Sequence, residues 1–285
     1  MRIVPFFLLV LVCSTSMGQQ LDNSQGSIAD DLLSFNRSFI RANHICGITI
    51  ERQLKRDGEG ISSTGEDLGF TFNNEGEMVS RSEIIFLFGT PDTTYTLLEY
   101  LGGKPGQIVE QNARSRTLWE YAWSDSTHCT ISRYRQDAEG TGRRTLINEE
   151  SLNVTRPNDT TEIALYRNDI GLPYYRETTT RNKSGFLLSS RREFLISGET
   201  TKYTYIYTAH GRIASRKEMK NGKEQETKYR YDDLGNLLSF TQDVRGETRE
   251  TQILYGESGV IEAILTRNEG QHRIEILKFT YDYCE

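Results

Sequence analysis

From about residue 161 to the C-terminus, hydrophobic and polar residues alternate in short runs separated by glycines. Tyr203, Tyr205 and Tyr207 fall on one side of such a run, and the opposite faces of these runs carry many Arg, Glu, Lys and Thr residues. A period of two is typical of strands with one buried face and one solvent-exposed face. No helical periodicity separates the runs, which disfavours a parallel β-α-β arrangement. The pattern therefore predicts an antiparallel meander.

The runs also recur as a repeat. Three tyrosines spaced 24 residues apart each precede a glycine by four positions: Tyr207 and Gly211, Tyr231 and Gly235, Tyr255 and Gly259. Self-similarity at a period of 20–50 residues indicates a repeat architecture. We expect the glycines to lie in turns with positive φ, where a side chain would be strained, and the tyrosines to form a row on one sheet face.

One unit, Tyr231-Asp232-Asp233-Leu234-Gly235-Asn236-Leu237, resembles the Tyr-Asp (YD) repeats of the rearrangement-hotspot (RHS) family, which read Tyr-Asp-x-x-Gly, a polar or basic residue, then Leu. The units at Tyr207 and Tyr255 lack the aspartate. The resemblance covers about 100 residues and implies antiparallel hairpins stacked into a curved sheet, which in long arrays encloses a shell. Three or four units are too few to enclose anything, so we expect an open sheet.

The N-terminal half follows a different pattern. Ile28, Leu32, Phe35 and Phe39 share one face at helical spacing, and with a cap at Ser27 they predict a helix over residues 27–42. A strand is expected over residues 47–54. A second, short helix is predicted over residues 84–88, after a cap at Ser80 or Ser82 and before Gly89 and Pro91. Trp119, Tyr121 and Trp123 alternate as a strand.

The order of that short helix, a Gly-Thr-Pro-Asp turn and a Trp-Glu-Tyr strand resembles the small outer-membrane lipoprotein of the barrel-assembly machinery, over Ser80 to Asp137. It implies a non-enzymatic α+β module of the envelope. We therefore predict a mostly-β fold with an N-terminal helical element, in which an antiparallel repeat meander sheet follows a small α+β module. The expected divisions are a signal peptide (1–18), an α+β module (19–156) and a β-hairpin repeat domain (157–285).

The N-terminus indicates export. Arg2, an apolar run from Ile3 to Val12 and small residues before Gln19 predict a signal peptide cleaved after Gly18. Lipidation at Cys13 is disfavoured because the preceding valine is bulky. No later stretch is apolar enough to span a membrane. The net charge of −6, with both signs interspersed, argues against a nucleic-acid partner. The expected location is periplasmic or extracellular.

Recognisable catalytic chemistry is absent from the sequence. It holds no Gly-x-Ser-x-Gly elbow and no phosphate-binding loop. We predict no catalytic, cofactor-binding or metal-binding residues, because the pairs His44/Cys46 and His128/Cys129 lie too far apart for a usual zinc pattern. Cys46, Cys129 and Cys284 permit one disulfide and one free thiol. The pairing is open, with Cys46–Cys129 preferred because both lie in the N-terminal half.

Two aromatic groups are candidates for a ligand or partner surface: Trp119, Tyr121 and Trp123, and Tyr203 with Tyr205. Flat rings can stack on sugars, although aromatic residues at strand spacing also form sheet cores. Asp232 is interpreted as a turn residue. We expect a non-enzymatic binding or structural protein of the bacterial envelope, with the YD-like sheet as surface for an unidentified protein or glycan. The alternatives are an envelope-glycan enzyme with dispersed carboxylates and an envelope assembly factor.

Overall fold

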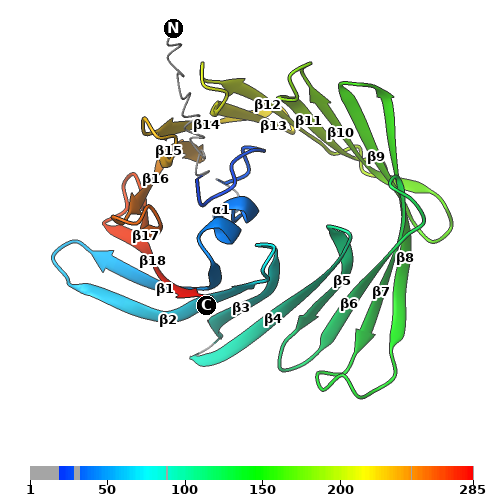
Figure 1. The fold of residues 1–285 in the computed structure, drawn as a ribbon, viewed down its shortest axis with the longest axis horizontal. Helices are drawn as coiled ribbons and strands as arrows, with labels where there is room; N and C mark the ends of the chain where they lie inside the picture. Colours follow the sequence, from blue (N-terminus) through cyan, green and yellow to red (C-terminus); the bar gives the residue numbers. More distant parts are fainter. Residues whose placement is uncertain (1–18, 29–32, 88, 245, 285) are drawn as a thin grey trace, which may run out of the picture.

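The computed structural model describes residues 19–28, 33–87, 89–244 and 246–284, so the expected signal peptide lies outside the described residues. These residues form one 18-stranded antiparallel sheet in which each strand pairs with the next along the chain. The last strand pairs with the first, so the sheet closes into a barrel (Figure 1). The prediction of a mostly-β, antiparallel fold is confirmed in this more specific form.

The strands of the first half are β1 (Ile45–Arg56), β2 (Ile61–Phe72), β3 (Met78–Leu87), β4 (Thr90–Leu101), β5 (Lys104–Gln111), β6 (Arg116–Trp123), β7 (His128–Gln136), β8 (Thr145–Asn158) and β9 (Thr161–Arg167). Those of the second half are β10 (Pro173–Arg181), β11 (Leu187–Phe194), β12 (Thr200–Tyr207), β13 (Ile213–Lys220), β14 (Lys223–Tyr231), β15 (Leu237–Val244), β16 (Glu247–Tyr255), β17 (Ile261–Asn268) and β18 (Arg273–Tyr283).

The helix predicted over residues 27–42 is wrong in its extent. Among the described residues the one α-helix is α1 (Arg37–Ala42), and no helix there is long and apolar enough to cross a bilayer. Asn36 caps it, because its side-chain oxygen accepts from the amides of Ser38 and Phe39. The described residues before Asn36 instead lie against the barrel wall, with a bridge from Leu21 to Phe35, and Leu32 of the predicted helical face lies outside the described residues. Isolated short helices are marginal, so this packing overrides the helical spacing.

The second predicted helix, over residues 84–88, is wrong. Met78–Leu87 is strand β3, bonded to β2 on one side and β4 on the other. β-Branched residues such as Ile84 and Ile85 suit a strand, and the ladders to β2, as far as Ile84, and to β4 supply backbone hydrogen bonds in place of those of a helix. Gly89 does have a positive φ of 83°, but it turns the chain between two strands.

The turn register of the repeat is confirmed. Gly211, Gly235 and Gly259 have φ values of 76°, 94° and 78°. The repeat tyrosines form a row, in which each hydroxyl donates to the carbonyl of an apolar residue two positions after the preceding turn glycine. The hydroxyl-to-carbonyl distances are 2.8 Å for Tyr207 to Leu187, 3.0 Å for Tyr231 to Ile213, 3.1 Å for Tyr255 to Leu237 and 2.5 Å for Tyr281 to Ile261.

The expectation of an open sheet is wrong. The strands of the N-terminal half continue the ladder of the repeat strands, and β1 pairs with β18 along its length. Cys46 and Cys284 form a disulfide beside this seam, with Cα atoms 5.4 Å apart, and Cys129 is buried and free. The preferred Cys46–Cys129 pairing is therefore wrong, because closure brings the two ends of the sheet together.

The division at residues 156 and 157 stays a prediction. Strand β8 runs through that position, and β9 continues the same sheet.

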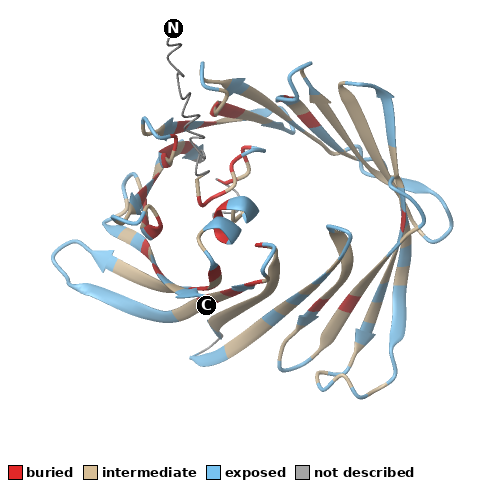
Figure 2. Ribbon diagram, viewed as in Figure 1, coloured by how far each residue is buried: buried red, intermediate tan, exposed pale blue. Residues whose placement is uncertain are grey.

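The barrel encloses the N-terminal segment, here residues 19–44, whose described part lies inside the ring against β13–β18 and β1–β3 (Figure 1). Leu21, Ile28 and Ile40 are fully buried there. Their neighbours in this core include Ile213, Leu237, Ile261 and Ile48 on the wall. Buried positions concentrate on this side of the ring, whereas β4–β11 are mostly intermediate or exposed (Figure 2). The core thus occupies one side of the barrel interior.

Candidate ligand site in the barrel lumen

The inner wall of the barrel is identified by contacts with the N-terminal segment. On β14, the Tyr229 hydroxyl donates to the Gly26 carbonyl at 2.7 Å, and the Tyr231 hydroxyl accepts from Asn23 at 3.0 Å. Side chains alternate across a strand, so Lys228 and Arg230 point outward, and both are exposed. Because directly paired residues share a sheet face, the register extends this assignment around the barrel.

The outer wall carries charged residues along its strands. Exposed residues on this wall include Glu99, Glu149, Arg191, Lys202, Lys228, Arg230, Arg267 and Lys278. Apolar residues form one paired row across β4–β8, namely Leu97, Val109, Leu118, Tyr134 and Leu146. Others, such as Ile206, Leu254 and Leu265, also face outward, interspersed with those charged residues. The outer wall is therefore largely polar.

The aromatic strand predicted from the sequence is β6, and its three rings face inward. Trp119, Tyr121 and Trp123 pair with Arg133, Ile131 and Cys129 on β7, and these continue through β8 to Tyr166 on β9. All of these residues except Cys129 line a pocket of about 420 Å3, within the usual size range of ligand sites. Its lining residues are Pro105, Trp119, Tyr121, Trp123, Ile131, Arg133, Asn148, Glu150, Leu152 and Tyr166.

Cations and hydrogen bonds hold the two indoles of this aromatic pocket. The Lys104 ammonium lies 3.8 Å from the Trp123 ring centroid, and the Arg133 guanidinium lies 5.3 Å from that of Trp119. Trp123 Nε1 donates to the Pro105 carbonyl at 3.1 Å. Both indoles are therefore fixed by neighbours on the adjacent strands.

Glu150 organises the polar side of the same pocket. Its carboxylate accepts from Asn148 Nδ2 at 2.7 Å and from the Tyr174 hydroxyl at 2.5 Å. Burial and the hydrogen bond to Glu150 raise the pKa of Tyr174, and burial raises that of Tyr121. Asn148 Oδ1 is buried and has no hydrogen-bond partner among the described residues. Asn148 therefore brings to the aromatic pocket a hydrogen-bond acceptor that no donor among the described residues satisfies.

Tyr203 and Tyr205 also face inward, but they line a different pocket of about 220 Å3 between the N-terminal segment and β9–β13. Arg192 and Arg216 lie 5.3 Å and 5.1 Å from the Tyr203 ring centroid. Burial raises the pKa of Tyr205 to about 12. The structure therefore does not join the two aromatic groups into one surface.

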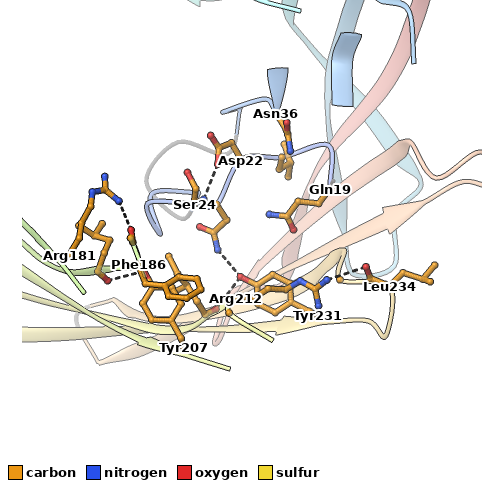
Figure 3. Close-up of a pocket in the computed structure, with 17 residues that line it drawn as sticks. Gln19, Asp22, Ser24, Asn36, Arg181, Phe186, Tyr207, Arg212, Tyr231 and Leu234 are labelled. Carbon is orange, nitrogen blue, oxygen red and sulfur yellow. Dashed lines mark hydrogen bonds between the residues drawn. The ribbon is translucent and has the colours of Figure 1, made fainter. Parts of the chain in front are cut away.

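The repeat residues line a third pocket, of about 440 Å3, where the N-terminal segment meets the wall (Figure 3). Tyr207, Gly211, Tyr231 and Gly235 all contribute to it. The Arg212 guanidinium donates to the Leu234 carbonyl at 3.1 Å across its edge. Since these side chains bond to one another and to the N-terminal segment, we assign this region to packing.

Asp232 behaves as a turn residue. Its carboxylate accepts from the backbone amide of Asn236 at 2.7 Å and from that side chain at 2.9 Å. Burial acts to raise the pKa of Asp232, but these bonds outweigh it and the pKa is lowered.

The histidine and cysteine pairs do not converge. Cys46 is in the disulfide, and His128 lies at an exposed turn with its ring nitrogen 2.9 Å from Asp125. Among the described residues, no three His, Cys, Asp or Glu side chains are grouped to hold a metal.

The polar residues of the aromatic pocket were not predicted. They are Arg133 on β7 and Asn148 and Glu150 on β8. Nothing in the sequence distinguishes them from other polar residues of partly solvent-exposed strands. Alternation could have placed each on one face of its strand. Only the register between strands brings them beside Trp119.

Comparison with known proteins gives distant similarities only. No family model and no curated protein matches the chain. A porin-like protein from Bacteroides uniformis ATCC 8492 is 13% identical, with 84% of this chain and 97% of that one covered and a TM-score of 0.39. One from Bacteroides vulgatus ATCC 8482 is 11% identical, with 84% and 98% covered and a TM-score of 0.34. The LolA superfamily protein NE2245 from Nitrosomonas europaea is 10% identical, with 85% and 87% covered and a TM-score of 0.16. At these TM-scores the similarities support no conclusion about function.

Proposed function

We propose that this chain is an exported, non-enzymatic binding protein of the bacterial cell envelope. Its barrel is surrounded by water, not inserted in a membrane, and it binds its ligand inside. The YD-like strands serve as scaffold, because residues 19–44 cover their inner face. Their outer face remains the surface for a protein partner. The ligand surface is the inner wall of β5–β9.

The observation that carries this proposal is the polarity of the wall. A barrel that spans a membrane presents an apolar band about 25 Å tall to lipid. Here Lys228 faces outward within β14, Arg191 does so within β11, and Lys278 does so within β18. Charged residues at such depth would be expensive in lipid, and the apolar residues of the outer wall are interspersed with charged ones. The two tryptophans and the repeat tyrosines face the interior instead.

Export is supported by two features. The sequence predicts a signal peptide before Gln19. The disulfide between Cys46 and Cys284 suits an oxidising compartment, since such bonds are rare where thiols are kept reduced.

The number and the partners of the carboxylates in the two inner pockets favour binding over catalysis. Glu150 is the one acidic residue that lines the aromatic pocket, and it is hydrogen-bonded to Asn148 and Tyr174. In the smaller pocket, the Glu177 carboxylate accepts from Arg192 at 3.3 Å, and Glu162 pairs with Arg156. The aromatic pocket therefore lacks the pair of carboxylates that glycan hydrolysis usually needs, and the two of the smaller pocket are each bound by an arginine.

Detergent phase partitioning tests the proposal. The chain, expressed with its own signal in a bacterial host and recovered from the periplasm, is expected to begin at Gln19 and to remain in the aqueous phase of Triton X-114. A known outer-membrane porin serves as the control for the detergent phase. Recovery of this protein in the detergent phase would contradict the proposal that the barrel is surrounded by water and not by lipid.

A further inference from the structure

We infer that the aromatic pocket of the inner wall binds a neutral carbohydrate. This inference rests on the proposed function and names the ligand class. It concerns the ten residues that line the pocket between β5 and β9, on the side of the barrel away from the buried core of residues 19–44.

The aromatic residues supply the stacking surface. Four of the ten lining residues are Trp or Tyr, and they come from two strands, β6 and β9. The face of an aromatic ring is negative, so it attracts the weakly positive C–H groups of a sugar ring. Trp119 and Trp123 are held in place by Arg133 and Lys104, so little side-chain freedom is lost when a ligand binds.

The polar residues supply directional hydrogen bonds of both kinds. Asn148 Oδ1 is a buried acceptor without a partner in the described part of the chain, and a sugar hydroxyl could donate to it. The Arg133 guanidinium makes no hydrogen bond or ion pair with the described residues, so its N–H groups are available to donate. Glu150 has accepting lone pairs beyond its two bonds.

The same residues disfavour the other ligand classes. An acyl chain would leave Arg133, Asn148 and Glu150 desolvated without compensation. An anionic glycan would gain from Arg133 and lose to Glu150, because the pocket lining carries one charge of each sign. A neutral sugar, with hydroxyls that both donate and accept, fits this balance.

Tryptophan fluorescence tests the inference directly, because Trp119 and Trp123 are the two tryptophans of the whole sequence and both line the pocket. The mature protein is titrated with maltohexaose, cellohexaose and chitohexaose as neutral probes. Hexagalacturonate is the anionic probe, and dodecanoate is the acyl probe. We expect a saturable change in emission with at least one neutral hexasaccharide and a weaker or absent response to the other two classes.

Two variants test the polar contacts. Asn148→Leu and Arg133→Met are each expected to weaken the binding of that hexasaccharide at least tenfold. The matched control is Thr130→Val, an exposed outward position on β7 next to the inward Ile131. Circular dichroism verifies folding, and because the two variants lie on different strands, either one alone keeps the test valid.

The outcomes separate this inference from the proposed function. If dodecanoate or hexagalacturonate binds and the neutral sugars do not, the sugar assignment is overturned, while binding inside the barrel stands. If no probe of any class alters the emission of the folded protein, the pocket is not a ligand site. Partition into detergent would refute the proposed function independently of the titrations.

Discussion

The side-chain amide of Asn23 donates to the hydroxyl of Tyr231 at 3.0 Å, although 208 residues separate the two in sequence. The same hydroxyl donates to the Ile213 carbonyl at 3.0 Å. One phenol therefore joins the N-terminal segment to the repeat ladder. Gln20 and Tyr281 repeat this relationship on β18, four strands beyond β14, with 3.0 Å between Gln20 Nε2 and the hydroxyl. The N-terminal segment is thus fastened to the same tyrosine row that defines the repeat.

A double-mutant cycle should detect this connection. Tyr231→Phe is expected to lower the free energy of unfolding by about 1–3 kcal/mol, because it leaves buried partners unsatisfied. Asn23→Ala should couple to it by at least about 0.5 kcal/mol in denaturant unfolding. Tyr95→Phe, at a 53% exposed outer-wall position, is the control and should change stability by less than about 0.5 kcal/mol. Strict additivity of the two inner substitutions would contradict a shared hydrogen bond.

Gly235→Val should destabilise the barrel by about 1–3 kcal/mol, because its φ of 94° strains any residue with a side chain. A Cβ atom at this position would also meet the Arg212 guanidinium, which would have to move. Gly259→Val isolates the backbone effect, since no atom lies within 4 Å of its added Cβ. Thermal denaturation compares both with Asp233→Ala, an exposed turn position expected to matter little. Equal melting temperatures for Gly235→Val and the parent would remove the basis of the turn register.

Reduction of Cys46–Cys284 should lower the free energy of unfolding by about 2–5 kcal/mol, since this bond cross-links residues 238 apart in sequence. The measurement is urea unfolding with and without reductant. The double variant Cys46→Ser/Cys284→Ser is the control and should not respond to reductant. Native thiol titration should give no fast-reacting group, because Cys129 is buried. A reactive thiol in the native oxidised protein would argue for a different pairing.

Stability should fall as the pH rises above about 10. Burial raises the pKa of Tyr205 from 10.0 to about 12 and also raises those of Tyr231 and Tyr255. Below pH 10 these phenols are neutral in the folded and in the unfolded chain, so their contribution to the free energy of unfolding is fully present. Between pH 10 and about 12 Tyr205 ionises first in the unfolded chain, which removes about 1.4 kcal/mol of stability per pH unit, and Tyr231 and Tyr255 shift the stability in the same direction. Unfolding at several alkaline pH values measures this slope, and Tyr205→Phe should reduce it. A flat profile up to pH 11 would contradict the burial of these rings.

Local rules in the sequence determined the turns and the strand faces. A glycine four residues after Tyr207, Tyr231 or Tyr255 marks a turn because the backbone there needs a positive φ. Alternation likewise placed the three tyrosines on one face, where they form the predicted row. These properties depend on neighbours within a few residues, so one sequence suffices to predict them.

Tertiary structure decided what depends on partners distant in the chain. Residues 80–88 have spacing that suits a short helix, yet β2 and β4 offer two ladders and the segment is a strand. The pairing of β1 with β18 closes the sheet and sets Cys46 beside Cys284, although neither strand alone identifies the other. The aromatic pocket arises in the same way. Trp119 was identified as a candidate from the sequence alone. Arg133 and Asn148 lie beside it only because of the register between strands, and a shift of one residue would turn them to the outer wall.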